Sequence, residues 1–293
     1  MNFTAHGKLL LTGEYAITQS ALGIAMPTSF GQHLSLESYD GPEHVLWEAL
    51  DHKNRQWFTA GFDHEGQILH TSSAAMADKL QGFLTPVRLS TNWNTPVRVQ
   101  TKVDFPRLWG LGTSSTLCSL LSQWAEVDAL SYRGLHGGSG YDLACAQATG
   151  AISYALKDGK PEVDSVQLPQ AMESVLFVYR GAKQQTDSSL KLVGRKPFST
   201  AQCEEISHLS EAFLIANSVD ELEDIIEQHE CLIASHLGLE RAIEGPFNGI
   251  KGQVKSLGGW GGDFVMLTRF EENRHWLEAN GFTTIIPFET MTL

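Results

Sequence analysis

Several features that would assign this chain of 293 residues to a specialised class are missing from its sequence. No apolar run is long enough to span a membrane, and the N-terminal residues lack the basic segment and long apolar run of a secretory signal. Basic residues are few, since 21 Lys and Arg against 34 Asp and Glu leave a net charge of −13. We therefore expect a cytoplasmic protein that binds neither membranes nor nucleic acid, which leaves room for a local basic pocket.

Motifs for metal binding and redox chemistry are missing as well. The four cysteines include no CxxC pair, and the 11 histidines are scattered without an HExxH. This pattern favours reduced, partly buried thiols and histidines that are structural or exposed. The phosphate-binding motif GxxxxGK[ST] is also absent, so a loop of another kind is needed for any bound nucleotide.

The composition is that of an ordinary globular protein, with 42% hydrophobic and 19% charged residues. The length is enough to bury a large core and favours a division in two. The pattern changes to short strands after Ser153, and Pro169 follows them. We therefore predict an N-terminal domain over residues 1–168 and a C-terminal domain over residues 169–293.

Periodicity predicts most of the secondary structure. Residues 30–70 alternate like antiparallel strands, and residues 72–84 have the spacing of a helix. Residues 173–181, ESVLFVYRG, have an apolar centre and are predicted to form a buried strand. Two long helices are predicted to begin near Ser199 and at Ser218, the second with the Ser-x-x-Glu pattern of a capping box.

A glycine-rich stretch, DFPRLWGLGTSS at residues 104–115, lies between a predicted strand over residues 97–105 and a predicted helix through residues 117–130. Glycines let the backbone approach a ligand, and a helix N-terminus offers unpaired N–H groups with a partial positive charge. The stretch is therefore a candidate phosphate cradle. A purely structural turn accounts for this local pattern equally well.

Two more glycine-rich turns and one lysine help to decide between a phosphate cradle and a structural turn at residues 104–115. In HGGSGYD, residues 136–142, Asp142 starts a predicted helix and is either a helix cap or a general base. In GGWGG, residues 258–262, four glycines have a high ordering cost and little packing value, which favours a nearby ligand. Lys8, just before an apolar strand at residues 9–11, is either a solvated strand end or a cation that reaches toward phosphate.

In chain order these segments resemble the motifs of the GHMP kinase superfamily. GKLLLTGEYAI at residues 7–17 is similar to the first motif, and Pro106 with GLGTSS at residues 110–115 is similar to the second. SGYD at residues 139–142 is similar to the segment with the catalytic acid, and residues 258–263 are similar to the third, glycine-rich motif. The resemblance covers the whole chain.

The resemblance is nearest to the mevalonate and phosphomevalonate kinase branch. Tyr15 stands where mevalonate kinases typically have His, and Asp263 follows the third loop as in phosphomevalonate kinases. GSGYDLACAQA also looks like the bacterial GYDIA subgroup. The implied fold is a two-domain α+β fold, with an N-terminal mixed α/β domain that binds ATP, a C-terminal ferredoxin-like α/β sandwich, and the active site in the cleft between them. The implied reaction is phosphorylation of 5-phosphomevalonate or mevalonate by ATP in isoprenoid precursor synthesis.

The resemblance also implies a role for each matching residue. Asp142 would orient or deprotonate the attacking oxygen, Lys8 would neutralise developing charge, and Ser114 would bind Mg²⁺ together with the ATP phosphates. The residues implied in ATP binding are Pro106, Gly110, Leu111, Gly112, Thr113, Ser114 and Ser115. The residues implied in substrate binding are Glu14, Tyr15, Ser139, Gly140, Lys183, Gly258, Gly259, Gly261 and Gly262.

Two departures from the family pattern leave alternatives open. Mevalonate kinases carry a second, acidic Mg²⁺ ligand before the SGxD acid, and no Glu stands at the matching place here. Either Glu126 or Asp128 substitutes, or Ser114, phosphates and water hold the ion alone. Trp260 stands in the third loop where a small residue is usual, which would narrow the acceptor pocket. The alternatives are a kinase for homoserine, a sugar or another small alcohol, and a catalytically silent binding protein of this fold; a homodimer is compatible with each.

Overall fold

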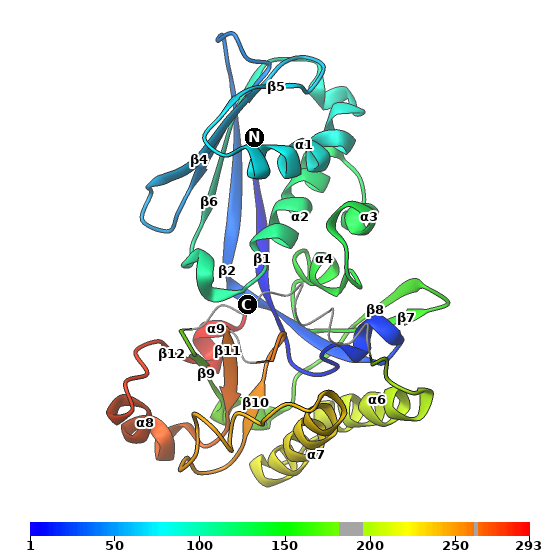
Figure 1. Ribbon diagram of the computed structural model, residues 1–293, viewed down its shortest axis with the longest axis vertical. Helices are drawn as coiled ribbons and strands as arrows, with labels where there is room; N and C mark the ends of the chain where they lie inside the picture. Colours follow the sequence, from blue (N-terminus) through cyan, green and yellow to red (C-terminus); the bar gives the residue numbers. More distant parts are fainter. Residues whose placement is uncertain (182–195, 261–262) are drawn as a thin grey trace. The chain divides into compact units, whose positions relative to one another are not determined.

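The computed structural model describes residues 1–181, 196–260 and 263–293 of the chain. It forms two compact units, each assembled from separate segments (Figure 1). Unit 1 consists of Met1–Gly7, Phe30–Arg107 and Leu111–Ala148, and unit 2 of Lys8–Ser29, Leu108–Gly110 and Thr149–Leu293. The chain passes from one unit into the other within strands β1 (Asn2–Leu10) and β2 (Gly23–Ser38). The domain boundary at residue 168 stays a prediction.

Unit 1 contains a sheet with the strand order β5-β4-β3-β6-β2, and β1 also pairs with β2. The further strands are β3 (Val45–Leu50), β4 (Gln56–Phe62), β5 (Ile68–Thr71) and β6 (Val97–Val103). Strands β3, β4 and β5 pair antiparallel in sequence, as the alternation predicts. Strand β6 inserts between β2 and β3, antiparallel to the first and parallel to the second. This insertion is a long-range pairing that local alternation does not indicate.

The core of unit 1 lies between the sheet and two helices, α1 (Ala74–Arg88) and α2 (Thr113–Ala125), that pack against each other. Alternate residues of β3 face this core, because successive strand side chains point to opposite faces of a sheet. The buried Trp, Tyr and Phe side chains of this core are Trp47, Phe58, Phe62, Phe83, Trp93, Trp124 and Tyr132. Burial of such aromatic side chains removes the most apolar area per residue from water and stabilises the unit.

The end of α2 corrects one prediction. The apolar spacing predicts a helix that continues to Leu130, whereas α2 ends at Ala125. Glu126 takes the left-handed backbone conformation with φ 56°, which stops the helical hydrogen-bond ladder. Asp128 then accepts a hydrogen bond from the Leu130 N–H and caps a separate 3-10 helix, η4 (Ala129–Tyr132). Leu130 therefore belongs to this new element, and Val127 lies in the connection between the two helices.

Unit 2 contains the start of β2 and a second sheet. The first residues of β2 pair antiparallel with β7 (Ile152–Lys157), which forms a hairpin with β8 (Lys160–Ser165). The second sheet has the order β10-β11-β9-β12 and is antiparallel throughout. Its strands are β9 (Leu176–Tyr179), β10 (Val254–Ser256), β11 (Phe264–Leu267) and β12 (Ile285–Pro287).

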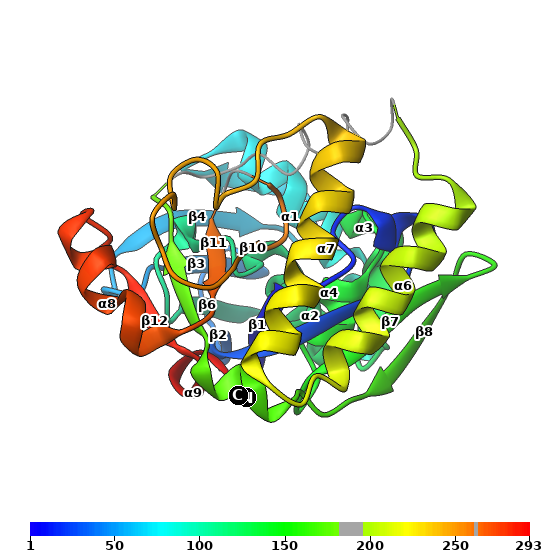
Figure 2. The ribbon, with the colours of Figure 1, turned by 90° about the horizontal axis from the view of Figure 1, so that it is seen from below.

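Helices connect the strands of this second sheet in the ferredoxin-like order. Helices α6 (Thr200–Leu214) and α7 (Val219–Leu237) lie between β9 and β10 in the chain and run side by side (Figure 2). Helix α8 (Phe270–Ala279) lies between β11 and β12, and the short α9 (Phe288–Met291) ends the chain. The ferredoxin-like arrangement expected for the C-terminal part is therefore confirmed. Over the described ranges, no helix has both the length and the apolar character that crossing a membrane requires.

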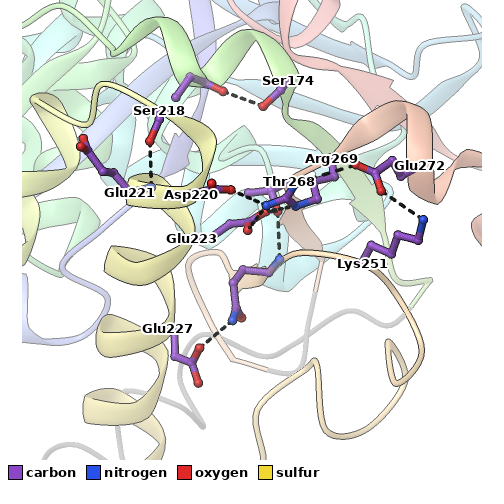
Figure 3. Close-up of polar contacts among 12 residues, drawn as sticks. Ser174, Ser218, Asp220, Glu221, Glu223, Glu227, Lys251, Thr268, Arg269 and Glu272 are labelled. Atoms are coloured by element: carbon purple, nitrogen blue, oxygen red, sulfur yellow. Dashed lines mark hydrogen bonds and ion pairs between the residues drawn. The ribbon is translucent and has the colours of Figure 1, made fainter.

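The N-termini of α6 and α7 test the capping predictions. Ser199 forms a complete capping box with Gln202 on α6. On α7 the Ser218 hydroxyl accepts a hydrogen bond from the Glu221 N–H at 3.2 Å, as predicted (Figure 3). The Glu221 carboxylate accepts instead from the Asn217 N–H at 2.7 Å, one residue earlier than a capping box requires. Both helices start at the predicted serines. Only the hydrogen bond from the N-cap N–H to the Glu221 carboxylate, which a capping box on α7 requires, is replaced.

Candidate active site

The glycine-rich stretch at residues 104–115 leads into the N-terminus of α2, as predicted. Gly112 is the N-cap residue with φ 92°, and Gly110 has φ 69°. L-residues with side chains rarely adopt this left-handed region, so both positions favour glycine. A glycine N-cap has no side chain to accept from the first N–H groups of the helix. These donors, with the partial positive charge of the helix end, suit a phosphate group.

Ser114 differs from the two polar residues that follow it in the first turns of α2. Its Oγ is buried and makes no hydrogen bond within the part of the chain that the structure describes. Ser115 Oγ donates to the Gly112 carbonyl at 2.9 Å, and Thr116 Oγ1 donates to Gln32 at 2.6 Å. An unsatisfied buried hydroxyl costs about 1–3 kcal/mol, so a missing partner is expected at Ser114. A serine oxygen is a suitable ligand for Mg²⁺, so Ser114 fits the metal role that the family resemblance implies.

The other residues of the second motif surround this helix end. Pro106 is half-buried between β6 and the 3-10 helix η3 (Arg107–Trp109). Leu111 is fully buried, and Thr113 is the first residue of α2. The motif therefore has an apolar anchor on one side of Gly112 and polar side chains on the other.

Asp142 lies in the first turn of α4 (Tyr141–Cys145), and the N-cap residue of that helix is Gly140 with φ 94°. Asp142 is therefore not the cap residue, which was the structural alternative. Its Oδ1 accepts a hydrogen bond from the Leu143 N–H at 3.1 Å. Its Oδ2 lies 3.5 Å from Nε2 of His136, and the Asp142 side chain is 17% exposed. The carboxylate is thus held in place while part of it remains accessible.

Ser114 and Asp142 lie on helices that pack against each other within unit 1. Cys118 follows Ser114 by one helical turn and so lies on the same face of α2. Burial, with a smaller contribution from the nearby charge of Asp142, raises the pKa of the Cys118 thiol to about 12, against the opposing charge of Lys79. The Cys118 thiol on α2 is therefore within electrostatic range of Asp142 on α4. The fold brings together two residues that are separated along the chain.

His136 is the residue of this region that sequence reasoning missed. It ends the short helix α3 (Arg133–His136), and its side chain is 13% exposed. The scattered histidines predict structural or exposed roles, and nothing in the histidine pattern separates this one from the others. Its position directly before the glycine turn and Asp142 is the signal that was available.

In unit 2, Lys8 lies near the end of β1 and its Nζ donates to the Gly110 carbonyl at 3.4 Å. A Cβ placed on Gly110 would come within 1.8 Å of Oδ2 of Asp263, the residue after the third loop. A side chain at position 110 would therefore have to displace the Asp263 carboxylate, in addition to adopting a left-handed backbone conformation. Residues from all three GHMP-like motifs meet here: Lys8 of the first, Gly110 of the second and Asp263 of the third.

Glu14 is fully buried and belongs to a cluster of charged side chains. Its Oε1 accepts from Lys255 Nζ at 2.5 Å, and its Oε2 lies 3.4 Å from Nε2 of His229. Lys255 also donates to Glu230 at 3.3 Å. Burial raises the pKa of Glu14 to about 7 against the opposing effect of Lys255, and burial with the charge of Lys255 lowers the pKa of His229 well below its ordinary value. The contacts of Glu14 in this structure are internal, and a substrate contact stays a prediction.

Tyr15 follows Glu14 in a strained turn. Its φ of 63° and ψ of −46°, with a hydrogen bond of 2.7 Å from the Ala16 N–H to the Glu14 carbonyl, define a γ-turn of the rare form with positive φ. The Tyr15 hydroxyl accepts a hydrogen bond from the Trp260 N–H at 2.7 Å. The Trp260 side chain is 3% exposed and packs with Tyr15 in an apolar cluster. The unusual tryptophan of the third loop is therefore held in the core.

The remaining predicted residues are described only in part. Ser139 is buried, and its Oγ accepts from the Tyr141 N–H at 3.4 Å. Gly258 has φ 64° and open space where a side chain would lie, and Gly259 is half-buried. Three predicted residues lie outside the described residues: Lys183, Gly261 and Gly262.

The proposed substitutes for the missing acidic Mg²⁺ ligand have other partners. Glu126 accepts from Asn92 Nδ2 at 3.3 Å, and Asp128 caps η4. Within the described residues, no group of three or more His, Cys, Asp and Glu side chains is placed to hold a metal ion. The alternative in which Ser114, phosphates and water hold the ion stays a prediction.

A scan against protein-family models finds no match, and a search of curated proteins finds none either. Solved structures do match over nearly the whole chain. A mevalonate kinase is 14% identical with a TM-score of 0.70, covering 100% of both chains. Phosphomevalonate kinase of Streptococcus pneumoniae, in complex with phosphomevalonate and AMPPNP, is 14% identical with a TM-score of 0.71 over 98% of this chain and 99% of that one. A D-glycero-D-manno-heptose 1-phosphate kinase from Bacteriodes thetaiotaomicron is 16% identical with a TM-score of 0.66 over 98% and 94%.

These matches establish the fold of the chain. It has the two-domain fold of the GHMP kinases, with a large mixed sheet and a second, smaller sheet. The fold that the motifs imply is confirmed, and its structural neighbours include both mevalonate and phosphomevalonate kinases. Identities of 14–16% leave the substrate open.

Proposed function

We propose that this chain is an ATP-dependent kinase that phosphorylates a small acceptor, 5-phosphomevalonate or mevalonate. The observation that carries the proposal is the buried, unpartnered hydroxyl of Ser114 at a glycine-capped helix N-terminus, in a chain with the GHMP kinase fold. A structural turn has no use for such a hydroxyl, because it adds a desolvation cost and no bond. The Streptococcus pneumoniae neighbour holds AMPPNP, an analogue of ATP, which supports ATP as the phosphoryl donor.

The residues of unit 1 supply what phosphoryl transfer requires, namely alignment, charge neutralisation and a proton acceptor. The backbone N–H groups at the start of α2 bind the donor's phosphates. Ser114 would hold Mg²⁺ with the phosphates and water, and the ion would neutralise the charge of the transferred group. Asp142, held by the Leu143 N–H, accepts the proton of the attacking hydroxyl. An acceptor that is itself a phosphate needs less help from this base.

The choice of acceptor rests on the first and third motifs. Tyr15 and Asp263 match the phosphomevalonate kinase pattern, which gives 5-phosphomevalonate a slight preference over mevalonate. The charge-neutralising role of Lys8 and the implied substrate contacts are part of the same proposal. A place in isoprenoid precursor synthesis, in the cytoplasm, follows if this acceptor is correct. The acidic ligand missing from the family pattern favours the second candidate, a catalytically silent binding protein of the same fold.

The test is an assay of ADP release with Mg²⁺ and ATP. The acceptors are mevalonate, 5-phosphomevalonate, homoserine and galactose, each with a control that lacks Mg²⁺, and products are identified by mass spectrometry. We expect Mg²⁺-dependent ADP release with 5-phosphomevalonate or mevalonate. ADP release with homoserine or galactose alone would show that the chain is a kinase for another acceptor. ATP binding without ADP release from any of the four supports the silent binding protein.

A further inference from the structure

His136 and Asp142 face each other across the glycine turn at residues 137–140. His136 Nε2 lies 3.5 Å from Asp142 Oδ2, and the two side chains are only 13% and 17% exposed. Helices α3 and α4 hold the two residues in place, both within unit 1. Gly137, Gly138 and Gly140 all have positive φ, which lets the chain reverse over so short a distance. The pairing is therefore built into the turn that precedes the proposed base.

The orientation of the imidazole follows from its second contact. His136 Nδ1 lies 3.0 Å from the carbonyl oxygen of Gly137. Because a carbonyl only accepts, Nδ1 carries the hydrogen of this bond, and Nε2 is the nitrogen directed at Asp142. A neutral ring presents its lone pair to the carboxyl group, and a protonated ring donates a hydrogen bond to the carboxylate. The neutral ring therefore suits a protonated Asp142, and the protonated ring suits the Asp142 carboxylate.

The other ionisable groups near Asp142 in unit 1 do not compete for its proton. Burial keeps the pKa of Cys118 near 12 and raises that of Tyr132 on η4, so both remain neutral at neutral pH. The charge of Lys79 on α1 lowers the pKa of Cys118 by less than burial raises it. An imidazole is a stronger base than a carboxylate in water, so it is suited to take a proton from a carboxylic acid.

We propose that His136 is the positioning residue and proton partner of Asp142, an assignment that rests on the proposed kinase function. The acceptor oxygen forms its bond to the γ-phosphorus as the bond from that phosphorus to the ADP oxygen breaks. The proton of the acceptor hydroxyl passes to Asp142 Oδ2, then to His136 Nε2, and the imidazolium releases it to water. The Leu143 N–H holds Oδ1, and the imidazole lies 3.5 Å from Oδ2, where it can receive the proton from that oxygen between turnovers.

The experiment compares three substitutions in the full chain with the best acceptor from the ADP assay. His136→Ala removes the imidazole, His136→Gln keeps a polar side chain that cannot carry the proton, and His208→Ala is the control at an 80% exposed histidine. We expect kcat to fall about 10- to 100-fold in both His136 variants, at or below the lower end of general acid–base effects, because His136 acts through Asp142. The KM for ATP should change by less than about twofold, because the second motif is untouched. Circular dichroism and thermal unfolding check that each variant is folded.

Added imidazole separates a proton role from a structural one. We expect it to restore kcat in His136→Ala at least about fivefold and to have no effect on Asp142→Asn, because only the first variant keeps the group that needs the partner. Unchanged kcat in folded His136→Ala, or a loss that imidazole leaves unaltered, overturns the proposal while the kinase function stands. A wild-type chain that releases no ADP with any acceptor refutes the kinase function and this inference with it.

Discussion

At the scale of single residues, the arrangement of Ser114 and Ser115 allows a direct comparison. Both are small hydroxyl side chains in the first turn of α2, but only the hydroxyl of Ser115 has a partner. Removing a buried hydroxyl that has no partner removes a desolvation penalty, whereas removing a hydrogen-bonded hydroxyl also loses the hydrogen bond. The two serines therefore separate a ligand-binding role from a structural one.

In the absence of ligand, Ser114→Ala is expected to leave the free energy of unfolding unchanged or to raise it by up to about 1 kcal/mol. The substitution removes a buried hydroxyl that has no hydrogen-bond partner within the described residues. The same change should raise the Mg²⁺ concentration needed for half-maximal ADP release, since an oxygen ligand is lost. Ser115→Ala is the matched control and should lower stability by about 1 kcal/mol with little effect on the Mg²⁺ requirement. An unaltered Mg²⁺ titration in Ser114→Ala would exclude it as a ligand.

Asp142→Asn keeps the size of the side chain and removes its ability to take a proton. We expect kcat to fall about 100-fold or more with a hydroxyl acceptor, and less with a phosphate acceptor that needs little base. The affinity for ATP should stay nearly intact. Asp224→Asn, on the exposed face of α7, is the control. Undiminished turnover in Asp142→Asn would remove this residue from the mechanism.

The buried carboxyl of Glu14 makes a prediction about pH. Its pKa is about 7 in the folded chain against an ordinary value of 4.5, so between these values the folded state holds a proton that the unfolded state has lost. The contribution of Glu14 to stability is thus present below pH 4.5 and is lost as the pH rises to about 7. The upper limit of this change is about 3 kcal/mol, and Lys255, Glu230 and His229 reduce it by their own titration and charge.

Glu14→Gln should therefore lower the free energy of unfolding by more at pH 5 than at pH 8. Urea unfolding at four pH values between these limits measures the difference from the wild type. Glu205→Gln, at an exposed position of α6, provides the control and should show no such trend. A destabilisation by Glu14→Gln that is the same at every pH would contradict the raised pKa.

At the scale of elements, a polar network joins the start of α7 to the segment between β11 and α8 (Figure 3). Arg269 bonds to Glu223 at 2.8 Å and to Asp220 at 2.5 Å. Thr268 is central because it is fully buried, donates to Glu223 at 2.6 Å and accepts from the Gln253 N–H at 2.9 Å. The network therefore links the first turns of α7 to the start of α8.

Thr268→Val keeps the shape of the side chain and removes both hydrogen bonds. We expect the free energy of unfolding to fall by about 1–3 kcal/mol, because the backbone N–H of Gln253 is left without its acceptor. Urea unfolding measures the loss, and the exposed Thr200→Val is the matched control. The activity per folded molecule should not change; an unaltered midpoint of unfolding would show that the network is dispensable.

At the scale of the whole molecule, nucleotide binding is expected to stabilise the fold. A ligand that binds only the folded state adds about 2.7 kcal/mol at a concentration 100 times its Kd. Thermal unfolding with AMPPNP and Mg²⁺ should therefore shift upward in the wild type, with a smaller shift in Ser114→Ala. If the unfolding temperature does not shift, the chain does not bind the nucleotide. That result would contradict both an active kinase and a catalytically silent protein that binds nucleotide.

The local pattern of the chain determined a large part of this picture. The period of two in β3 and β4 and the period of 3.6 in α1 place the core faces, because each element must bury its apolar side. Glycines at 110, 112 and 140 mark turns that need positive φ, and this requirement is visible without any neighbour. Asp142 and Ser114 could be predicted because each is adjacent to such a turn.

Only the tertiary structure decided which distant groups meet. The insertion of β6 between β2 and β3, the pairing of Glu14 with Lys255 and the orphan hydroxyl of Ser114 depend on packing between segments far apart in the chain. His136 lies close to Asp142 in sequence, yet the ring orientation that gives it a role depends on backbone angles that scattered histidines do not reveal. Residue types and spacing determine which chemistry is available, and three-dimensional contacts decide which of those groups have partners, because burial and distance are properties of the folded chain.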